Sequence, residues 1–544
     1  MRGACTVLPN SIDQITSRWT RMDPDFDSES HLRFQNDWNG QQFTAIRIHG
    51  GVRNLASGIF DYHESLEAIY ASHNLLTSIP PQIGRLALLT HLDLSFNSLA
   101  VLPQEIGNLR SLTELNLASN LFCSLPFELV KLTKLKLLDV RNNPLPNELL
   151  TAAENPNNVR EIVHQMLSRM TIDKKPMPQR KWRTLIENCP EGSAKFFVLS
   201  YNVLSDSILN NERHECPEWC TEWTFRSQQL IREIVFYNAD IVALQEVEEE
   251  KFYTFFTPEL KAHGYDGVFS SKSRSRTMSE EKRKRVDGCA MFWKSESFQL
   301  RTHRTVEFSQ MAISLHSNWD AMIDRVMVKD HVALIAVLET KDGIYKKNGL
   351  ESMEDAQENK SGRPLVVSNV HVTWDPVYSD VKLIQTMMLL HECTKEIDKV
   401  AEVDNLSPEE VPMVLAGDFN SLPTSEVLDY LIKGQISKDH EELQHFHGST
   451  ALDSISSGDT ADTSYRHRLS LEAAINLQNP SITNITTKFK ATVDYILATP
   501  RSLQCLGFLK GLKKKWMKAN EINDLPNALF PSDHIPVVAQ YALK

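Results

Sequence analysis

The chain has 544 residues, with 58 Lys and Arg against 70 Asp and Glu, which gives a formal net charge of −12 at pH 7. This length predicts two or more domains, because a single hydrophobic core rarely organises so long a chain. The acidic balance argues against nucleic-acid binding through bulk charge, although a local basic patch would still permit it.

The sequence predicts neither a signal peptide nor a membrane-spanning helix. Met1 is followed by RGACTVLPNSIDQ, which lacks the apolar core of a signal peptide. No run of about 18 apolar residues occurs, so we expect no membrane-spanning helix. The 8 cysteines are scattered, which favours a reducing compartment. Cys216 and Cys220 with His214 have neither the usual zinc spacing nor a second pair nearby, so zinc there is not favoured.

The first part of the chain divides into an arm and a repeat. Residues 1–42 are polar and irregular, and we expect an arm that packs on the following domain through Trp19, Phe34 and Trp38. The pattern L-x-x-(I/L)-x-(A/L/V)-x-x-N-x-L then recurs every 23 residues, starting at Leu66, Leu89, Leu112 and Leu135. This period and template are those of a leucine-rich repeat.

The repeats predict an N-terminal solenoid over residues 43–171. Each unit supplies a short strand and a return, and cannot bury its apolar face without its neighbours. Side chains at one equivalent position can stack as a ladder that hydrogen-bonds the backbone: Asn74, Asn97, Asn120 and Asn143. A degenerate first turn contains Phe43, Ile46 and Ile48, and one helix over residues 147–170 is expected to cap the end. Such a slab usually binds proteins, and the alternative is a structural appendage.

A basic, proline-broken linker, residues 172–191, leads to a second domain, residues 192–544. Strands are expected at AKFFVLSYN, ADIVALQE, VDGCAMFWK, PLVVSNVHV, VPMVLAGD, ATVDYILATP and SDHIPVVAQYAL, and helices at RSQQLIREIVFYN and Val381–Val400. Residues 271–286 read as an exposed loop, and residues 434–480 as loop-rich. Strands that alternate with helices and loops are typical of a layered α/β domain whose sheets are covered on both sides.

The stretch VPMVLAGDFNSLPT, residues 411–424, reads as a buried strand that stops abruptly at Gly417. Ligands bind at such strand ends in layered α/β folds, because the rigid sheet fixes the side chains that follow. Asp418 and Asn420 are two residues apart and can point the same way. A carboxylate and a carboxamide there suit a hard cation, a water or a phosphate oxygen. The alternative is an ordinary turn.

Polar residues stand at strand ends throughout the second domain. Each of them alone has a structural explanation, such as a capped turn or a satisfied core polar group. Their recurrence at one strand end after another indicates a site: Asn202, Glu246, Asn369, His371, Asp418, Asn420, Asp494, Asp533 and His534.

The motifs SYNVLSD, LQEVE, VHVTWDP, LAGDFNS, TVDYIL and SDHIPV resemble those of the exonuclease–endonuclease–phosphatase superfamily. With leucine-rich repeats in front, residues 43–544 resemble the leucine-rich-repeat catalytic deadenylase subunits of the carbon-catabolite-repressor–Not complex. The resemblance implies a four-layer α/β sandwich with two facing sheets. It also implies an Mg²⁺-dependent 3′-to-5′ exoribonuclease that shortens mRNA poly(A) tails and releases 5′-AMP.

The same resemblance assigns roles to the strand-end residues. Glu246 is implied as the Mg²⁺ ligand, with Asn202 and Asp533 nearby. Asp418 and Asn420 would position the attacking water or stabilise the phosphate. His534, paired with Asp494 or Asp533, would act as general base or as a phosphate donor. His371 and Asn369 would bind the scissile phosphate. These types fit the chemistry, because attack on an anionic phosphodiester requires charge neutralisation and Mg²⁺ prefers oxygen ligands.

The resemblance further implies that Pro376 and Phe489 sandwich the terminal adenine. A flat apolar pair can stack on a base, and hydrogen bonds from nearby groups would supply the selectivity. The alternative for Phe489 is a core position under the sheet. Lys488 and Lys490 on either side favour an exposed edge instead.

Two other functions fit the sequence less well. An inositol-lipid phosphatase of the same fold should carry an Arg soon after GD-x-N and a W-C-D-R motif, whereas this chain has GDFNSLP and PSDHIPV. A non-catalytic scaffold is opposed by the filled catalytic positions.

Partners and location follow from the resemblance. The repeats are expected to bind a second deadenylase subunit and, through it, the scaffold of the complex. The chain shows no RNA-recognition motif, so partners would bring it to messages. No membrane partner is expected, and we expect residence in the cytoplasm and the nucleus.

Overall fold

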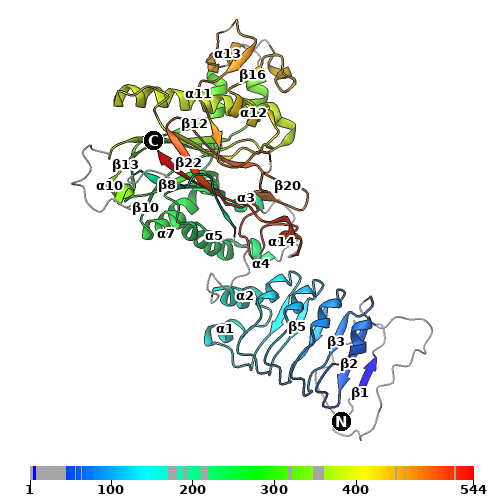
Figure 1. Cartoon of the computed structure of the whole chain (residues 1–544). Coiled ribbons are helices and arrows are strands. Elements are labelled where there is room, and N and C mark those ends of the chain that lie inside the picture. Colours follow the sequence, from blue (N-terminus) through cyan, green and yellow to red (C-terminus); the bar gives the residue numbers. More distant parts are fainter. Residues whose placement is uncertain are drawn as a thin grey trace. The chain divides into compact units, whose positions relative to one another are not determined.

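A computed structural model divides the chain into two compact units (Figure 1). The first unit contains residues 1–177, 215–221 and 527–529, and the second contains residues 178–214, 222–526 and 530–544. The structure describes residues 4–7, 44–55, 57–62, 64–168, 180–187, 193–209, 218–315, 321–346, 361–447, 450–459, 461–478, 480–519, 522–527 and 529–544. The predictions for Trp19, Phe34, Trp38, Phe43, His214 and Cys216 lie outside these residues.

The first unit is built on one sheet whose strands follow chain order. They are β1 (Ala4–Val7), β2 (Ala45–His49), β3 (Ala68–Tyr70), β4 (His91–Asp93), β5 (Glu114–Asn116) and β6 (Leu137–Asp139). The strands β2 to β6 are parallel, so that Ile69, Leu92 and Leu115 lie opposite one another, 23 residues apart. The antiparallel β1 corrects the expectation of an irregular arm, because its four residues pair with β2.

Short 3₁₀ helices return the chain between these strands: η2 (Ser57–Tyr62), η3 (Pro81–Arg85), η4 (Gln104–Asn108) and η5 (Phe127–Lys131). Three of them start directly after a proline, at Pro80, Pro103 and Pro126. The fixed φ of proline sets the entry into the turn, and its missing N–H is not needed there. The 23-residue period is therefore one strand and one 3₁₀ turn.

The predicted asparagine ladder is confirmed. The buried Asn120 donates from Nδ2 to the carbonyl of Leu94 at 2.9 Å and accepts from the amide of Leu99 at 3.0 Å. Each bond joins one repeat to the preceding one. The same pair of bonds recurs at Asn74, Asn97 and Asn143. These amides satisfy backbone groups that the tight turns would otherwise leave buried and unpaired.

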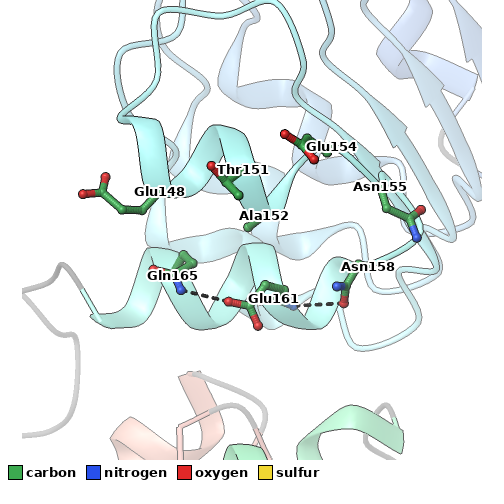
Figure 2. Close-up of a pocket in the computed structure, with 8 residues that line it drawn as sticks. All are labelled: Glu148, Thr151, Ala152, Glu154, Asn155, Asn158, Glu161 and Gln165. Carbon is green, nitrogen blue, oxygen red and sulfur yellow. Dashed lines mark hydrogen bonds between the residues drawn. The ribbon is translucent and has the colours of Figure 1, made fainter.

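Two helices, rather than the single one expected, follow the last repeat: α1 (Asn147–Ala152) and α2 (Val159–Ser168). The break contains Pro156, which has no amide to donate within a helix. The carbonyl of Pro156 instead accepts from the amide of Leu138 on the edge strand β6 at 2.9 Å. A pocket of about 400 Å³ is lined by residues of these two helices and of the segment between them. Figure 2 shows its lining side chains, such as Glu148, Glu154 and Glu161.

The second unit contains two large sheets. The order in the first is β10 (Tyr265–Ser271), β11 (Asp287–Lys294), β9 (Ile241–Glu248), β8 (Lys195–Asn202), β23 (Val537–Leu543), β22 (Leu503–Leu509) and β7 (Trp182–Thr184). The order in the second is β12 (Phe298–Glu307), β13 (Val332–Thr340), β14 (Pro364–His371), β15 (Met413–Asp418), β21 (Asp494–Ala498) and β18 (Glu472–Ala473). Two small hairpins pair β16 (Gln435–Ser437) with β17 (Ser464–Arg466), and β19 (Asn484–Ile485) with β20 (Lys490–Ala491).

The helices of this unit are mostly short. They are α3 (Asp206–Leu209), α5 (Trp223–Tyr237), α6 (Glu249–Lys251), η7 (Phe252–Phe256), α7 (Thr257–Ala262), η8 (Ser273–Thr277), α8 (Glu280–Arg283), α9 (Phe308–Leu315), η9 (Met322–Met327), α10 (Asp342–Lys346), η11 (Pro376–Tyr378), α11 (Ser379–Asp404), α12 (Glu426–Lys433), η12 (Glu441–Phe446), α13 (Thr450–Ile455) and α14 (Lys514–Ala519). The short α4 (Glu218–Thr221) belongs to the first unit. No described helix combines the length and apolarity needed to cross a bilayer.

The two sheets pack face to face and are covered by helices on their outer sides, which makes four layers. One core contains inward side chains of both sheets, such as Val198 on β8 and Ala336 on β13, together with Leu389 on α11. A second core joins the outer face of the first sheet to α5 and α7 through residues such as Leu199 and Leu230. The expected four-layer α/β architecture is confirmed in this unit.

Several expectations for the second unit need correction. The strands β10, β12, β13 and β22 were not predicted. Part of the expected linker is strand β7, because Trp182–Thr184 pairs with β22. The expected exposed loop 271–286 contains two helical turns and three buried side chains, Lys272, Ser275 and Val286. A basic residue turned toward an internal carboxylate cannot be told from a solvated one by local composition.

Candidate active site

The ends of neighbouring strands from both sheets bring the predicted residues together. Asn202 ends β8 and Glu246 lies in β9 of the first sheet. His371 ends β14, Asp418 ends β15 and Asp494 starts β21 of the second sheet. All are buried. The parallel pair β14–β15 sets His371 beside Asp418, and the antiparallel pair β15–β21 sets Asp418 opposite Asp494.

A bulge in β9 positions Glu246. The register between β9 and β11 shifts at Gly288–Ala290, so Gln245 and Glu246 share the place of one residue. Glu246 adopts φ 60°, a left-handed conformation that is rare for a residue with a side chain. Bulges re-aim a side chain, and strained residues of this kind gather at functional sites.

The amide of Asn202 bridges the two sheets. Its Nδ2 donates to Oε1 of Glu246 at 2.9 Å and to Oδ2 of Asp418 at 3.0 Å. The second oxygen of Glu246 accepts from the backbone amide of Ser205 at 2.9 Å. Asn202 therefore holds two carboxylates in fixed orientation without neutralising them.

The backbone of β15 lies very close to β14 just before Asp418 and Asn420. A Cβ at Gly417 would lie 2.1 Å from the carbonyl of Val370, so only glycine fits beside β14. Beyond it, the amide of Asn420 donates to Oδ1 of Asp418 at 2.9 Å, with Asn420 at φ 46°. Nδ2 of Asn420 donates to the carbonyl of Val372 at 3.2 Å. The predicted strand end is confirmed, and both side chains lie at the site.

His534 is enclosed by carboxylates. Its Nδ1 lies 2.8 Å from Oδ2 of Asp494, and its Nε2 lies 3.7 Å from Asp418 and 3.9 Å from Asp533. Burial alone would lower the pKa of His534, but the charges of Asp494, Asp533 and Asp418 outweigh it and raise this pKa well above the usual value. The surrounding carboxylates therefore favour the imidazolium form of His534.

His371 has the opposite electrostatics. Burial lowers its pKa to about 4, although Asp418 favours the charged form. Its Nε2 lies 3.8 Å from Asp418 and 4.0 Å from Glu246, and its buried Nδ1 has no hydrogen-bond partner among the described residues. His371 is neutral at pH 7, so the site holds one charged and one neutral imidazole.

The carboxylates are held at high proton affinity. Burial and the charges of Asp287 and Asp533 raise the pKa of Glu246 to about 7. Burial and the charge of Asp494 raise the pKa of Asp418. Like charges buried together favour a proton or a cation.

Sequence reasoning missed an ion-pair cluster behind Glu246. Nζ of Lys272 lies 2.6 Å from one oxygen of Asp287, and Arg274 lies 2.7 Å from the other. Both basic side chains therefore pair with Asp287, and Arg274 also pairs with Asp330 at 2.5 Å. The available signal was the acidic residue at the start of VDGCAMFWK, which stands at a strand end like the other site residues.

Asn369 does not join the site, which corrects its assignment to phosphate binding. Its Nδ2 donates to the carbonyls of Leu244 and Ala290 at 2.8 Å, and its Oδ1 accepts from Gln245 at 2.7 Å. The side chain is fully buried and uses both hydrogens across the interface between the sheets. Asn369 joins the sheets directly beside the bulge.

The two residues expected to hold the base are exposed. Phe489 is 44% exposed, in the turn between β19 and β20, so the alternative of a core position is wrong. Pro376 starts η11, five residues beyond His371, and is also exposed. Trp374, which lies between His371 and Pro376 in the sequence, is 65% exposed. The hairpin of Phe489 reaches the site, because Nδ2 of Asn484 donates to Oδ2 of Asp533 at 3.0 Å.

The donor set fits a hard divalent cation. Glu246 and Asp533 supply carboxylate oxygens and Asn202 an amide oxygen, the ligand types that Mg²⁺ takes. Ligand atoms of Asp418, Asp494 and His534 also lie within 4.8 Å of one another. The second set is the poorer one, because the raised pKa of His534 keeps a proton on the nitrogen that would have to ligate.

The model of the endonuclease/exonuclease/phosphatase family matches residues 199–534, which span every residue of this cluster. The chain belongs to this family. A leucine-rich-repeat model matches residues 88–109. The family resemblance drawn from the motifs is therefore confirmed.

Whole-chain relatives carry both units. A zebrafish (Danio rerio) protein named CCR4-NOT transcription complex subunit 6-like is 41% identical over 92% of this chain and 89% of its own. The Schizosaccharomyces pombe protein named CCR4-Not complex 3′-5′-exoribonuclease subunit Ccr4 is 36% identical over 94% of this chain and 75% of its own. Among solved structures, ANGEL2, titled a 2′,3′-cyclic phosphatase, aligns with a TM-score of 0.51 over 67% of this chain and 99% of its own, at 24% identity. That likeness shows the fold alone.

Proposed function

We propose that the protein is an Mg²⁺-dependent 3′-to-5′ exoribonuclease that shortens poly(A) and releases 5′-AMP. The observation that carries the proposal is the joining of Glu246 and Asp418 through Asn202 across two sheets, with a charged His534 on the same carboxylate. The names of the whole-chain relatives support the reaction and its direction.

The cation would be held by Glu246, with Asn202 and Asp533 beside it. Bound Mg²⁺ supplies charge that stabilises the phosphorane-like transition state. The raised pKa of Glu246 supports this assignment, because a cation would take the place of the proton that burial favours. The hydrogen bond from Asn202 fixes the orientation of the Glu246 carboxylate.

Asp418 and Asn420 would orient the attacking water and a phosphate oxygen. The backbone bond from Asn420 fixes one oxygen of Asp418, which leaves the other facing the imidazoles. The carboxylates around His534 favour its protonated form, so it suits an N–H donor to a phosphate oxygen or to the leaving group better than a base. Asp494 holds that ring from Nδ1. Neutral His371 can accept a proton or donate to phosphate from Nε2.

The terminal adenine would lie between Pro376 and Phe489. Both are exposed, and each is tied to the site by a short segment: Pro376 through the strand of His371, and Phe489 through the hairpin of Asn484. A base stacked on an aromatic ring gains about 1–3 kcal/mol.

The repeat unit would be a solenoid that docks the second deadenylase subunit of a CCR4-Not complex. Exposed apolar side chains support a docking surface: Phe96 is 49%, Leu121 54% and Val101 72% exposed. Phe96 is stacked on His73 at 4.2 Å. Co-purification with that subunit should be lost in Phe96→Ser/Leu121→Ser, while cleavage of naked RNA persists. Residence in the cytoplasm and nucleus completes the proposal, and imaging of the tagged protein tests it.

One assay tests the reaction. Purified protein is incubated with Mg²⁺ and a 5′-labelled RNA that ends in about 20 adenosines, and both the ladder and the released nucleotide are resolved. Stepwise shortening with 5′-AMP as product is expected, and EDTA should stop it. Internal cuts, or a 3′-AMP product, would contradict the proposal. A parallel incubation with RNA bearing a 2′,3′-cyclic phosphate tests the activity named for the structural neighbour.

A further inference from the structure

A lysine cluster stands out in this acidic chain. Residues 510–518 read KGLKKKWMK, with five lysines and no acidic residue, whereas the whole chain has a net charge of −12. We call Lys510, Lys513, Lys514, Lys515 and Lys518 the α14 lysine patch. All five are exposed, and none forms an ion pair with a carboxylate of the described residues.

Three exposed lysines on α11 and α12 behave differently. Lys395 lies 3.0 Å from Glu392, Lys399 lies 3.3 Å from Glu396, and Lys433 pairs with Asp429. These pairs on α11 and α12 cancel charge locally. The α14 lysine patch leaves its charge uncompensated, so a positive potential remains over that surface.

Backbone bonds fasten the patch to the hairpin β19–β20. The amide of Gly511 donates to Oγ of Ser481 at 2.9 Å, just before the hairpin. After α14, the amide of Leu525 donates to the carbonyl of Ile485 in β19 at 3.2 Å. Figure 1 shows α14 beside β20. The patch and the hairpin therefore form one surface.

The same hairpin reaches the site. The amide of Ile485 donates to the carbonyl of Asp533 at 2.9 Å, next to His534. The turn of the hairpin carries Phe489 between Lys488 and Lys490, and all three are exposed. Basic side chains thus continue from the mouth of the site, along the hairpin, to α14.

We propose that the α14 lysine patch binds the phosphates of the RNA strand upstream of the nucleotide being removed. The inference rests on the proposed exoribonuclease activity and adds where the rest of the substrate lies. Lysine is a flexible point charge that binds phosphate without reading sequence, which suits a strand that moves by one nucleotide per cycle. The nearby aromatic ring of Phe489 would hold the terminal base while the patch holds the backbone.

The test compares a patch variant with a control of equal charge. Lys513→Gln/Lys514→Gln/Lys515→Gln is assayed on 20-adenosine and 4-adenosine RNA from about 50 to 200 mM salt. Each phosphate contact on a single strand contributes about 0.7 to the salt slope, so loss of three should flatten it by about 2. We expect KM for the long RNA to rise about tenfold at about 50 mM salt, with the short RNA unchanged.

Lys395→Gln/Lys399→Gln/Lys433→Gln removes the same charge from α11 and α12 and should leave both substrates unaffected. Equal behaviour of the two triple variants on the long RNA would overturn the inference, and an acidic protein surface would then be the partner to seek. Wild-type protein that shortens neither RNA would instead remove the proposed function.

A measurement on the wild-type protein guards against a folding defect in the variant. Exposed lysines are acetylated briefly with and without 20-adenosine RNA, in EDTA so that the RNA persists, and modified sites are read by mass spectrometry. Protection of the α14 lysine patch by the long RNA but not by the 4-adenosine RNA is expected. Equal labelling of the patch with and without the long RNA contradicts the proposal.

Discussion

The two units bury polar side chains in opposite ways. In the repeat unit, Asn120 and its equivalents bond backbone groups of the preceding repeat, with every distance near 3 Å. In the catalytic unit, the buried polar groups face one another. His371 and Asp494 each keep one polar atom without a hydrogen-bond partner among the described residues. In the repeat unit, the buried side chains satisfy the hydrogen-bonding groups of the backbone. In the catalytic unit, unpaired polar atoms remain that can bind a substrate or an ion.

The difference separates polar residues that fold the chain from those that act on something else. Ladder asparagines repeat every 23 residues because each serves the same turn. Site residues occur once each, and several have perturbed pKa values: burial and neighbouring carboxylates raise the pKa of Glu246 to about 7, whereas burial lowers that of His371 to about 4. Titratable groups with perturbed pKa values that gather at one edge of the sheets indicate a functional site. Polar side chains whose hydrogen bonds are all made within the protein indicate a structural role.

The largest expected effect is on catalysis. Glu246→Ala and Asp418→Ala should each lower kcat/KM on poly(A) by at least about a hundredfold, since loss of a pre-organised group costs about 3 kcal/mol or more. The melting temperature should stay level or rise, because a buried carboxylate of raised pKa is lost. Near-wild-type cleavage by either purified variant in Mg²⁺ would remove that residue from the site.

A second prediction, in the repeat unit, is a loss of stability without a loss of activity. Asn120→Ala leaves the carbonyl of Leu94 and the amide of Leu99 buried without partners, which should cost about 2–3 kcal/mol of unfolding free energy. Cleavage of naked RNA should be unchanged at temperatures where the unit stays folded. Chemical denaturation measures the loss.

Asn108→Ala is the matched control, because Asn108 is an exposed residue of η4. Its stability should stay close to that of the wild type. If the two variants were equally stable, the ladder would not be a source of stability in this unit.

Sequence reasoning located most of the site because strand ends are local. The motif around Asp418 predicts a strand, a required glycine and a turn within a few residues, and the structure confirms them. It failed where a contact crosses the two sheets. Asn369 stands at a strand end like the others, yet its amide is used by Leu244, Ala290 and Gln245 of the facing sheet.

The bulge at Glu246 and the burial of Lys272 were missed for the same reason. Each depends on β11, which lies next to β9 in the sheet but starts 39 residues after the end of β9 in the chain. The strands β12 and β13 carry no strand-end motif of the kind that located the other strands. The sequence repeat and the motifs therefore predict individual strands and the residues at their ends. The pairing of strands far apart in the chain decides which of those side chains remain available for binding or catalysis.

A third prediction concerns the exposed rim of the site. Phe489→Ala should slow removal of adenosine about 5- to 150-fold, the equivalent of about 1–3 kcal/mol for one stacked base. Because the ring is 44% exposed, the melting temperature should hardly change. Tyr253→Ala, at another exposed aromatic ring, is the control and should retain full activity. Unchanged poly(A) cleavage by Phe489→Ala would place the base elsewhere.

The smallest expected effect is the pH dependence of Mg²⁺ binding without substrate. A pKa of about 7 leaves Glu246 about one-tenth ionised at pH 6 and about nine-tenths at pH 8, so Mg²⁺ affinity should rise about tenfold between them. Because this pKa is raised on folding, its contribution to metal-free stability is fully present below the unfolded value near 4.5 and is lost as pH rises through about 7. The rise in melting temperature caused by Mg²⁺ should thus be larger at pH 8.

Glu246→Gln separates this carboxylate from the rest of the site, since the amide keeps the shape and does not titrate. The variant should show a small Mg²⁺ shift that is the same at both pH values. Glu249→Gln, which removes a carboxylate paired with Arg283 at 3.1 Å three residues away, should behave like the wild type. The neutral His371, with a pKa of about 4, does not change charge between pH 6 and 8 and adds no slope of its own. A Mg²⁺ shift in Glu246→Gln that still grew with pH would move the titrating ligand to Asp418, whose pKa burial and Asp494 also raise.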